Sequence, residues 1–439
     1  MSQPLPPLYT TAGEESFARR SIRDRHAATL LELIELNGVG EPYRSRLLDF
    51  RRESLGGRLT DPLAGSRAGW DLALFERREL ADWRRAIRPQ VGRSWYELPW
   101  YFAESFWFLR LLLAFGYYEP RGPNRLRDPF EPFKRRELLQ SGGGLEAASG
   151  LVPLLPGPAA APPDAVTEEP ATAVAGLLLA SLWGNRMDLS MHSLAREYRG
   201  RFLPHQAAEL LIDHSREASR RLLASRRVDL ILDNAGPELV CDLLLAARLL
   251  AERLAGAGPR QVVLHAKRAP FYVSDARPAD IQATIRALSD AADLPVRAAG
   301  SLLGRLLDEG RLRISDHWFW NGPRFFRDLP ADLRAELGAA DLVLIKGDAN
   351  YRRLAGDRHW PPSTALENLT GYFPAPFAVL RTMKSEIVVD LRAPQVERLE
   401  REDPEWRTNG RRGLVRLVAR DEANLQPASS RPRPASGWR

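Results

Sequence analysis

The sequence has almost no cysteine and no long apolar run, and each absence narrows the class of protein. A single cysteine, Cys241, among 439 residues excludes an intramolecular disulfide and a cysteine-based zinc or iron–sulfur site. No stretch approaches the roughly 18 apolar residues that indicate a membrane-spanning helix. The N-terminus lacks a basic start followed by an apolar run, so we expect no signal peptide. We therefore expect a soluble protein of the cytoplasm with no membrane partner.

Lysine is also scarce. The chain has 63 basic residues, of which four are lysine and 59 are arginine; the lysines are Lys134, Lys267, Lys346 and Lys384. A lysine is a compact point charge, whereas arginine is a planar fork, so each lysine in this arginine-rich chain stands out. The formal net charge of +7 and the isoelectric point of about 9.7 favour anionic ligands in general.

Several motifs of nucleotide and hydrolase chemistry are absent. The chain has no G-x-x-x-x-G-K-[ST], which excludes a P-loop nucleotide hydrolase, and no G-x-S-x-G nucleophile turn. Gly256 and Gly258 stand between a helix and a strand, which is the wrong context for a dinucleotide fingerprint. Asp229 and Asp233 are four residues apart, so the Asp-x-Asp of haloacid dehalogenase phosphatases is missing.

The N-terminal third has the apolar spacing of helices, and we expect a helical domain over 1–140. One predicted helix begins with Ser16 as its N-cap and ends near Asn37. Another, over 98–118, is apolar nearly all round and should be buried, so its Glu104 and Arg110 need partners.

Three further segments follow. Gly, Pro and Ala dominate residues 141–170, which we interpret as a linker or insertion. Residues 171–424 alternate between β-rich and helical stretches, and 425–439 should be disordered. The strands predicted in this region are 228–234, 260–267, 341–347, 377–383 and 386–391. This alternation predicts an α/β domain with a mainly parallel sheet and helices on both faces.

Polar residues follow four of these strands. In a parallel sheet, ligands bind beyond the carboxyl ends of the strands, so these residues should share one edge. They are Asp233 and Asn234 after the first strand, Asp275 after the second, Lys346, Asp348 and Asn350 after the third, and Arg381, Thr382 and Lys384 after the fourth. The oxygens of Asp233, Asn234 and Asp275 suit a hard divalent cation, and nearby cations suit a phosphoryl group.

Each of these features has a structural alternative. An Asp-Asn pair before a helix also serves as a cap, and an aspartate in a loop also forms a turn. The run 346–358 also suits a solvated loop. Trp318, Phe319 and Trp320 favour a core or pocket wall over a base-stacking platform, so we expect no nucleic-acid partner.

The chain resembles the damage-control phosphatase family, in its acidic-residue methyltransferase 1-like subfamily. The resemblance rests on ordered blocks that cover most of the chain, among them SFARRSIRDR (16–25), DPFEPFK (128–134), VDLILDNAGPELVCDLLLA (228–246), HAKRAPFYVSD (265–275), KGDANYRRLAGDRHW (346–360) and LRTMKSEIVV (380–389). It implies a three-layer α/β/α core with an N-terminal helical region, and a phosphatase that needs a divalent metal such as Mn²⁺, Co²⁺, Ni²⁺ or Mg²⁺.

The resemblance also implies site residues. Asp233, Asn234 and Asp275 match the family's metal ligands. The matches to its substrate-binding positions are Asp348, Asn350, Tyr351, Arg352 and the lysine of the Arg-Thr-x-Lys signature, here Lys384. We add Lys346 and Arg381 to the substrate-facing set, and we expect residues 353–360 to anchor the loop.

The implied substrates are sugar phosphates such as fructose 1-phosphate and fructose 6-phosphate, hydrolysed by water or through an aspartyl-phosphate on Asp233. The alternative is an S-adenosylmethionine-dependent methyltransferase acting on protein glutamate carboxylates. No Gly-rich turn follows the first α/β strand, which argues weakly against it. A sugar-phosphate-binding protein without turnover is the third interpretation, and the sequence indicates no oligomeric state.

Overall fold

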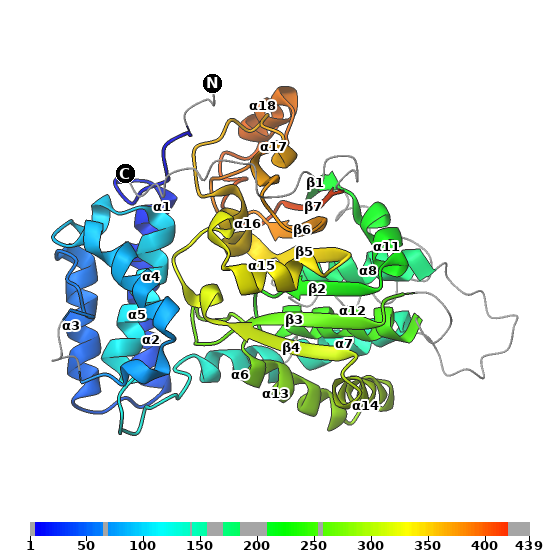
Figure 1. Ribbon diagram of the computed structural model, residues 1–439, viewed down its shortest axis with the longest axis horizontal. Helices are drawn as coiled ribbons and strands as arrows, with labels where there is room; N and C mark the ends of the chain where they lie inside the picture. Colours follow the sequence, from blue (N-terminus) through cyan, green and yellow to red (C-terminus); the bar gives the residue numbers. More distant parts are fainter. Residues whose placement is uncertain are drawn as a thin grey trace, which may run out of the picture. The chain divides into compact units, whose positions relative to one another are not determined.

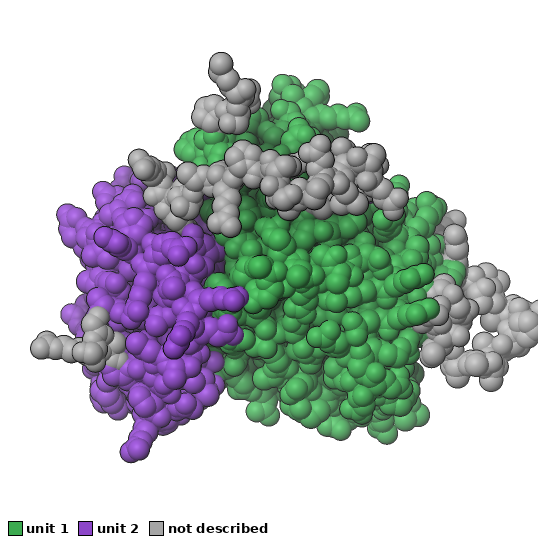
Figure 2. Space-filling model, viewed as in Figure 1, with its two compact units in different colours: residues 1–7, 128–321, 325–417 green, residues 8–127, 322–324, 418–439 purple. Residues whose placement is uncertain are grey.

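The chain divides into two compact units, which Figure 2 distinguishes by colour. The computed structural model describes residues 5–64, 69–140, 143–155, 170–184, 209–252 and 258–419. One unit comprises residues 8–127, 322–324 and 418–439, and the other comprises residues 1–7, 128–321 and 325–417. Each unit is described by itself below.

The smaller unit is helical. Its helices are α1 (Phe17–Arg20), α2 (Ala27–Leu36), α3 (Tyr43–Gly56), α4 (Arg77–Ile87) and α5 (Trp100–Phe115), and a π-helical turn over Ser21–His26 joins the first two. Ser16 caps α1 by accepting a hydrogen bond from the amide of Arg19, as the sequence predicts. Apolar side chains bury α5 on nearly every side.

The two charged residues of α5 have the partners that their burial requires. Glu104 accepts hydrogen bonds from Ser21 and, at 3.3 Å, from Arg25. Arg110 pairs with Glu53 and donates to Thr60 at 3.0 Å. Because both charges are compensated, the aromatic core tolerates them.

The larger unit contains a seven-stranded sheet (Figure 1). The strand order is β1-β7-β6-β5-β2-β3-β4, and neighbours β1–β7, β6–β5, β5–β2, β2–β3 and β3–β4 pair in parallel. The strands are β1 (Leu210–Asp213), β2 (Arg227–Ile231), β3 (Gln261–Lys267), β4 (Leu312–His317), β5 (Leu342–Lys346), β6 (Phe377–Thr382) and β7 (Gly413–Val418).

Helices cover both faces of this sheet (Figure 1), which confirms the three-layer α/β prediction. Alternate strand residues such as Val228, Leu264 and Leu344 join one large apolar core with the first set of helices. That set is α7 (Gly144–Leu151), α8 (Pro170–Trp183), α11 (Ser215–Ala224), α12 (Pro237–Glu252), α13 (Pro278–Ser289) and α14 (Leu294–Asp308). The other helices of this unit are α6 (Glu131–Leu139), α15 (Ala331–Gly338), α16 (Gly347–Ala355), α17 (Leu366–Thr370) and α18 (Ala393–Glu402).

Two sequence interpretations need correction here. Residues Gly144–Leu151 form α7, and Ala148 and Leu151 are buried in the apolar core, so this part of the 141–170 segment is not a linker. Residues 156–169 and the 425–439 tail lie outside the described residues.

The strand expected over 386–391 is wrong. No strand pairs with it among the described residues: Val389 donates its amide to the Tyr351 hydroxyl, Ile387 accepts from Arg381, and Asp390 and Leu391 donate to the carbonyls of Thr364 and Pro362, which lie outside any strand. Asp390, with φ of +71°, also ends the extended run.

Candidate functional site

Four adjacent parallel strands end at one edge of the sheet, as the sequence predicts. The order β6-β5-β2-β3 and the parallel pairing place their carboxyl ends side by side. Asp233 and Asn234 follow β2, Lys267 ends β3 and Lys346 ends β5. This edge is therefore where a ligand of such a sheet is expected to bind.

The three candidate metal ligands are brought together by the backbone. Asn234 and Asp275 face each other in an isolated antiparallel bridge. The amide of Ala276 donates to the Asp233 carbonyl at 2.8 Å, and the amide of Ala235 donates to the Ser274 carbonyl at 2.7 Å. The loop after β3 thus folds back and sets Asp275 beside the Asp233-Asn234 pair.

That loop carries backbone strain directly before Asp275. Tyr272 and Val273 have φ of +56° and +65°, which is unfavourable for any side chain and most of all for a β-branched one. Lys267 lies over the Tyr272 ring at 4.3 Å. The Ser274 hydroxyl donates to Asn234 Oδ1. These contacts hold the loop in the strained conformation that presents Asp275.

The carboxyl groups of Asp233, Glu238 and Asp275 lie close together at this edge. Burial raises the pKa of Asp233 well above its ordinary value, and the Glu238 and Asp275 carboxylates raise it further. Burial likewise raises the pKa of Asp275, although Lys267 forms an ion pair with it and opposes the change. A divalent cation would stabilise the charged form of these neighbouring carboxyl groups, and their oxygens are ligands that such ions prefer. These donors therefore fit a metal ion.

The donor set is small. Among the described residues, no group of three or more His, Cys, Asp or Glu side chains has the arrangement of a metal site. The fit therefore rests on two carboxylates and the oxygen of Asn234. A Mg²⁺-type ion is compatible with so few protein ligands because it keeps several water molecules.

Gly347 explains how β5 approaches this site. Its φ is +84°, and a Cβ atom there would lie 2.0 Å from Asp233 Oδ2. Only glycine allows the turn from β5 into α16 to pass this close to the carboxylate.

Lys346 does not face the open edge, which corrects the sequence prediction. Its ammonium is buried and donates to Glu238 at 2.7 Å and to Asp242 at 2.9 Å. Glu238 in turn accepts from the Asn234 amide at 2.9 Å. Lys346 therefore holds Glu238, which orients Asn234, and is not placed to contact a substrate.

Asp348 and Arg381 form an anchor between α16 and β6. Arg381 is fully buried and donates from Nε to Asp348 at 2.7 Å. The Tyr351 ring lies 4.1 Å from the Arg381 guanidinium carbon. Burial alone would raise the pKa of Asp348, but the Arg381 and Arg352 guanidinium groups hold it below its ordinary value.

Asn350 and Arg352 are also occupied inside the protein. The Asn350 amide donates to the carbonyls of Leu232 and Lys346 at 3.1 and 2.9 Å, which ties β2 to β5. Arg352 is buried and forms a two-point ion pair with Asp357 at 2.8 and 3.0 Å. Both side chains fix the 346–352 segment in place.

Lys384 is a predicted site residue whose side chain is not occupied by contacts with the described residues. It is partly exposed, and its ammonium forms no hydrogen bond or ion pair with any residue that the structure describes. It is close enough to Asp233 to lower that group's pKa against the effect of burial. Lys384 therefore offers a positive charge next to the candidate metal ligands.

Three residues near the site escaped sequence reasoning. Lys267 ends β3, so the same strand-end argument applies to it. Glu238 lies in the first turn of α12, directly after the turn that carries Asp233 and Asn234, so its closeness in the sequence was the available signal. Glu137 comes from α6, far earlier in the chain, and no sequence pattern connects it with the sheet edge.

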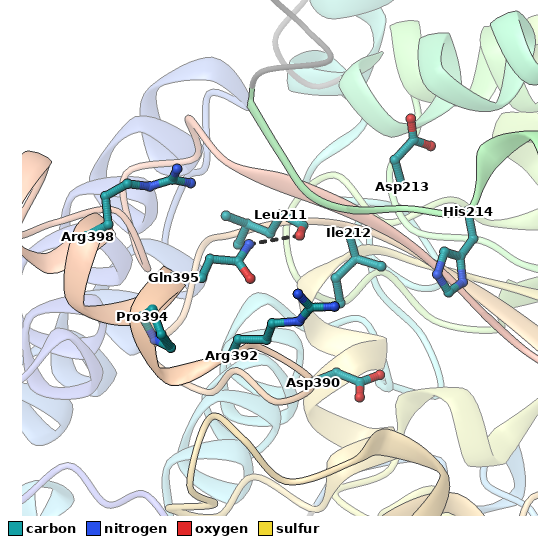
Figure 3. A pocket seen from close by; sticks show the side chains of 9 residues that line it. All are labelled: Leu211, Ile212, Asp213, His214, Asp390, Arg392, Pro394, Gln395 and Arg398. Carbon is teal, nitrogen blue, oxygen red and sulfur yellow. Dashed lines mark hydrogen bonds between the residues drawn. The ribbon is translucent and has the colours of Figure 1, made fainter.

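A cavity of about 560 Å³ lies elsewhere in this unit, between β1 and α18 (Figure 3). Asp213, Asp390, Arg392 and Arg398 line it with opposing charges, and Gln395 donates to the Leu211 carbonyl at 2.9 Å. None of the predicted site residues lines this cavity. The candidate site is therefore separate from it.

Comparison with known proteins assigns the chain to a family. Residues 30–399 match the model of the damage-control phosphatase ARMT1-like domain. Damage-control phosphatase ARMT1 of Danio rerio is 31% identical over 94% of this chain and 97% of its own. The protein of that name from Homo sapiens is 30% identical over 74% of this chain and 75% of its own. The chain belongs to the ARMT1-like damage-control phosphatase family, as the sequence blocks predict.

A similarity to a solved structure is weak. A DUF89 family protein from Pyrococcus horikoshii superposes with a TM-score of 0.43 at 13% identity, over 91% of this chain and 98% of that chain. A likeness of this size adds nothing to the family assignment.

Among the described residues, no helix combines the length and apolar character that crossing a bilayer requires.

Proposed function

We propose that this chain is a divalent-metal-dependent phosphatase that hydrolyses sugar phosphomonoesters of the fructose 1-phosphate or fructose 6-phosphate type. Membership of a damage-control phosphatase family supports the phosphatase class. Overall, water is consumed and the bond between phosphorus and the sugar oxygen breaks, either by direct attack of water on phosphorus or through an aspartyl-phosphate on Asp233 that water then hydrolyses; the products are the free sugar and inorganic phosphate. The substrate class and the metal requirement are our proposals.

One observation carries this proposal. Asp233, Asn234 and Asp275 converge at the carboxyl edge of the sheet, and the Lys384 side chain lies beside them with no partner for its ammonium among the described residues. Closely placed carboxyl groups suit a divalent cation. An ammonium without an ion-pair partner among the described residues suits a phosphoryl oxygen. Together they form a receptor for a phosphate bound with a metal ion.

The site residues have three different roles in this proposal. Asp233, Asn234 and Asp275 would hold Mn²⁺, Co²⁺, Ni²⁺ or Mg²⁺, and such an ion supplies charge stabilisation of the phosphoryl group and an activated water molecule. Lys384 offsets charge on the phosphoryl oxygens. Lys346 acts through Glu238 to orient Asn234, and it is a positioning residue.

The test is a phosphate-release screen on the full chain after metal removal. Fructose 1-phosphate, fructose 6-phosphate and other sugar phosphates are each assayed with Mg²⁺, Mn²⁺, Co²⁺ and Ni²⁺. We expect release from at least one sugar phosphate that depends on added metal. Asp233→Asn should abolish it, while Asp290→Asn, an exposed acid at the end of α13, serves as the matched control.

Two results would contradict the proposal. One is the absence of phosphate release from every sugar phosphate with every metal. The other is base-labile methyl transfer from labelled S-adenosylmethionine to protein carboxylates without any phosphatase activity, which would favour the methyltransferase alternative.

A further inference from the structure

Glu137 on α6 places a carboxylate next to the turn that carries the candidate metal ligands. A Cβ atom on Gly236 would lie 3.1 Å from Glu137 Oε2 and 3.2 Å from its Cβ. Gly236, with φ of +75°, directly follows Asp233, Asn234 and Ala235 and precedes α12. The helix α6 thus brings a carboxylate from far along the chain to the same edge as the strand-end residues.

Glu137 differs from the paired carboxylates here, because it has no hydrogen-bond or ion-pair partner among the residues that the structure describes. Asp275 pairs with Lys267, Glu238 with Lys346, and Asp348 with Arg381. Glu137 is only partly exposed, yet no described residue forms a hydrogen bond or an ion pair with it. Burial raises the pKa of its carboxyl group, against the opposing effect of Arg136 and Lys384. An unpaired carboxylate in a partly buried position is costly unless a ligand satisfies it.

The chemistry of a sugar phosphate matches the two open groups. Its phosphoryl group is an anion, which a carboxylate repels and an ammonium attracts. Its remaining polar groups are hydroxyls, which donate well to a carboxylate. Lys384 thus suits the phosphoryl end, and Glu137 is left for the hydroxyl end.

We propose that Glu137 is a substrate-binding residue that accepts hydrogen bonds from the sugar hydroxyls and selects polyhydroxylated phosphomonoesters over simple alkyl ones. The inference rests on the proposed function and names the group that recognises its substrate class. A site built to bond a hydroxyl discriminates strongly against an analogue without it, because its own polar group then stays unsatisfied.

The test compares two substrates whose leaving groups are both alkoxides, fructose 6-phosphate and n-butyl phosphate. The wild type should prefer the sugar phosphate. Glu137→Ala should lower kcat/KM for the sugar phosphate roughly 10- to 100-fold and leave n-butyl phosphate within about twofold. Glu137→Gln, which keeps a carbonyl acceptor, should lose less than Glu137→Ala. Glu131→Gln, an exposed acid on the same helix, is the control and should match the wild type.

Other outcomes overturn the inference in distinguishable ways. An equal loss on both substrates, with Glu137→Gln as poor as Glu137→Ala, assigns Glu137 to proton transfer or to the fold. A lower thermal midpoint in both variants would indicate a role in the fold, and an unchanged midpoint would indicate proton transfer. Unchanged kinetics in both variants remove any role. If the wild type releases phosphate from none of the sugar phosphates with any of the four metals, the proposed function itself fails; if it hydrolyses another sugar phosphate, that substrate replaces fructose 6-phosphate in the comparison.

Discussion

Lys346 and Lys384 follow neighbouring strands but have opposite surroundings. The Lys346 ammonium is buried between Glu238 and Asp242, whereas Lys384 is partly exposed and open. Burial and the Glu238 carboxylate raise the pKa of Asp242 to about 6, although Lys346 opposes the rise. Residue type and strand position alone do not separate the two lysines.

Replacing each lysine should therefore give a different defect. Lys346→Met leaves two buried carboxylates without their cation and should lower the free energy of unfolding by about 3–5 kcal/mol. Lys384→Ala should change it by no more than about 0.5 kcal/mol and lower kcat/KM at least about tenfold. Denaturant unfolding and steady-state kinetics measure both effects. A Lys346→Met variant as stable as the wild type would contradict the buried ion pairs with Glu238 and Asp242.

Gly347 is a second residue whose role the geometry fixes. Because a methyl group there would overlap the Asp233 carboxylate, Gly347→Ala should displace Asp233 and cost about 1–3 kcal/mol of stability, with loss of most activity. Gly304→Ala on α14, where an added Cβ meets nothing within 4 Å, is the control. Normal activity in Gly347→Ala would mean that the turn is wrongly placed.

At the scale of elements, the Asp348–Arg381 pair joins α16 to β6. Asp348→Asn should lower the free energy of unfolding by about 1–3 kcal/mol at neutral pH. Because the folded-state pKa of Asp348 lies below its ordinary 3.8, its contribution is complete above that value and is lost as the pH falls through the lower folded-state value.

The stability difference between wild type and Asp348→Asn should therefore be constant above about pH 4 and shrink below it. Urea unfolding at a series of pH values measures it. A difference that grows on acidification has the wrong sign for this ion pair and would contradict the described contact.

The strands that build the site were predictable, and others were not. β2, β3, β5 and β6 are short apolar runs bounded by turns, the pattern of strands buried on both faces. β4, at the end of the sheet, has the sequence LRISDH, and its polar residues interrupt the apolar run from which a strand is predicted. Residues 386–391 have strand-forming side chains, but Tyr351 and Arg381 take up their backbone groups, a tertiary effect that no local pattern contains.

At the scale of the whole molecule, part of the arginine excess has a structural use. Arg353 is buried and donates to the carbonyls of Phe319 and Trp320 at 2.7 and 3.2 Å, beside rings that are themselves core. The prediction that residues after 352 anchor the loop is confirmed for Arg353. Positive net charge is therefore a poor guide to the ligand, since Arg352, Arg353 and Arg381 are all occupied internally.

Sequence reasoning found the edge of the sheet but not the direction of each side chain. Asp233, Asn234, Asp275 and Lys384 lie where the strand-end argument places them. Lys346 and Asn350 turn inward to contacts from other elements, whereas Arg352 turns inward to Asp357, five residues further along the chain. Glu137 was beyond reach, since only the packing of α6 brings it to Gly236.

Metal binding should stabilise the whole larger unit. A ligand that binds the folded state alone at a hundred times its Kd adds about 2.7 kcal/mol, so the thermal midpoint should rise by roughly 5–10 °C with saturating Mn²⁺. Asp233→Asn should abolish the rise without lowering the metal-free midpoint, because burial and neighbouring carboxylates already disfavour charge at Asp233. Asp290→Asn should respond like the wild type.

The central claim is that Asp233, Asn234 and Asp275 hold a divalent ion required for phosphomonoester hydrolysis, and one measurement tests it most directly. Metal-stripped wild type and metal-stripped Asp233→Asn are each titrated with Mn²⁺ while phosphate release from fructose 6-phosphate and fructose 1-phosphate is followed. We predict no release without metal, saturable recovery in the wild type and none in the folded variant. Full release by the stripped wild type, or equal recovery in Asp233→Asn, would contradict the account.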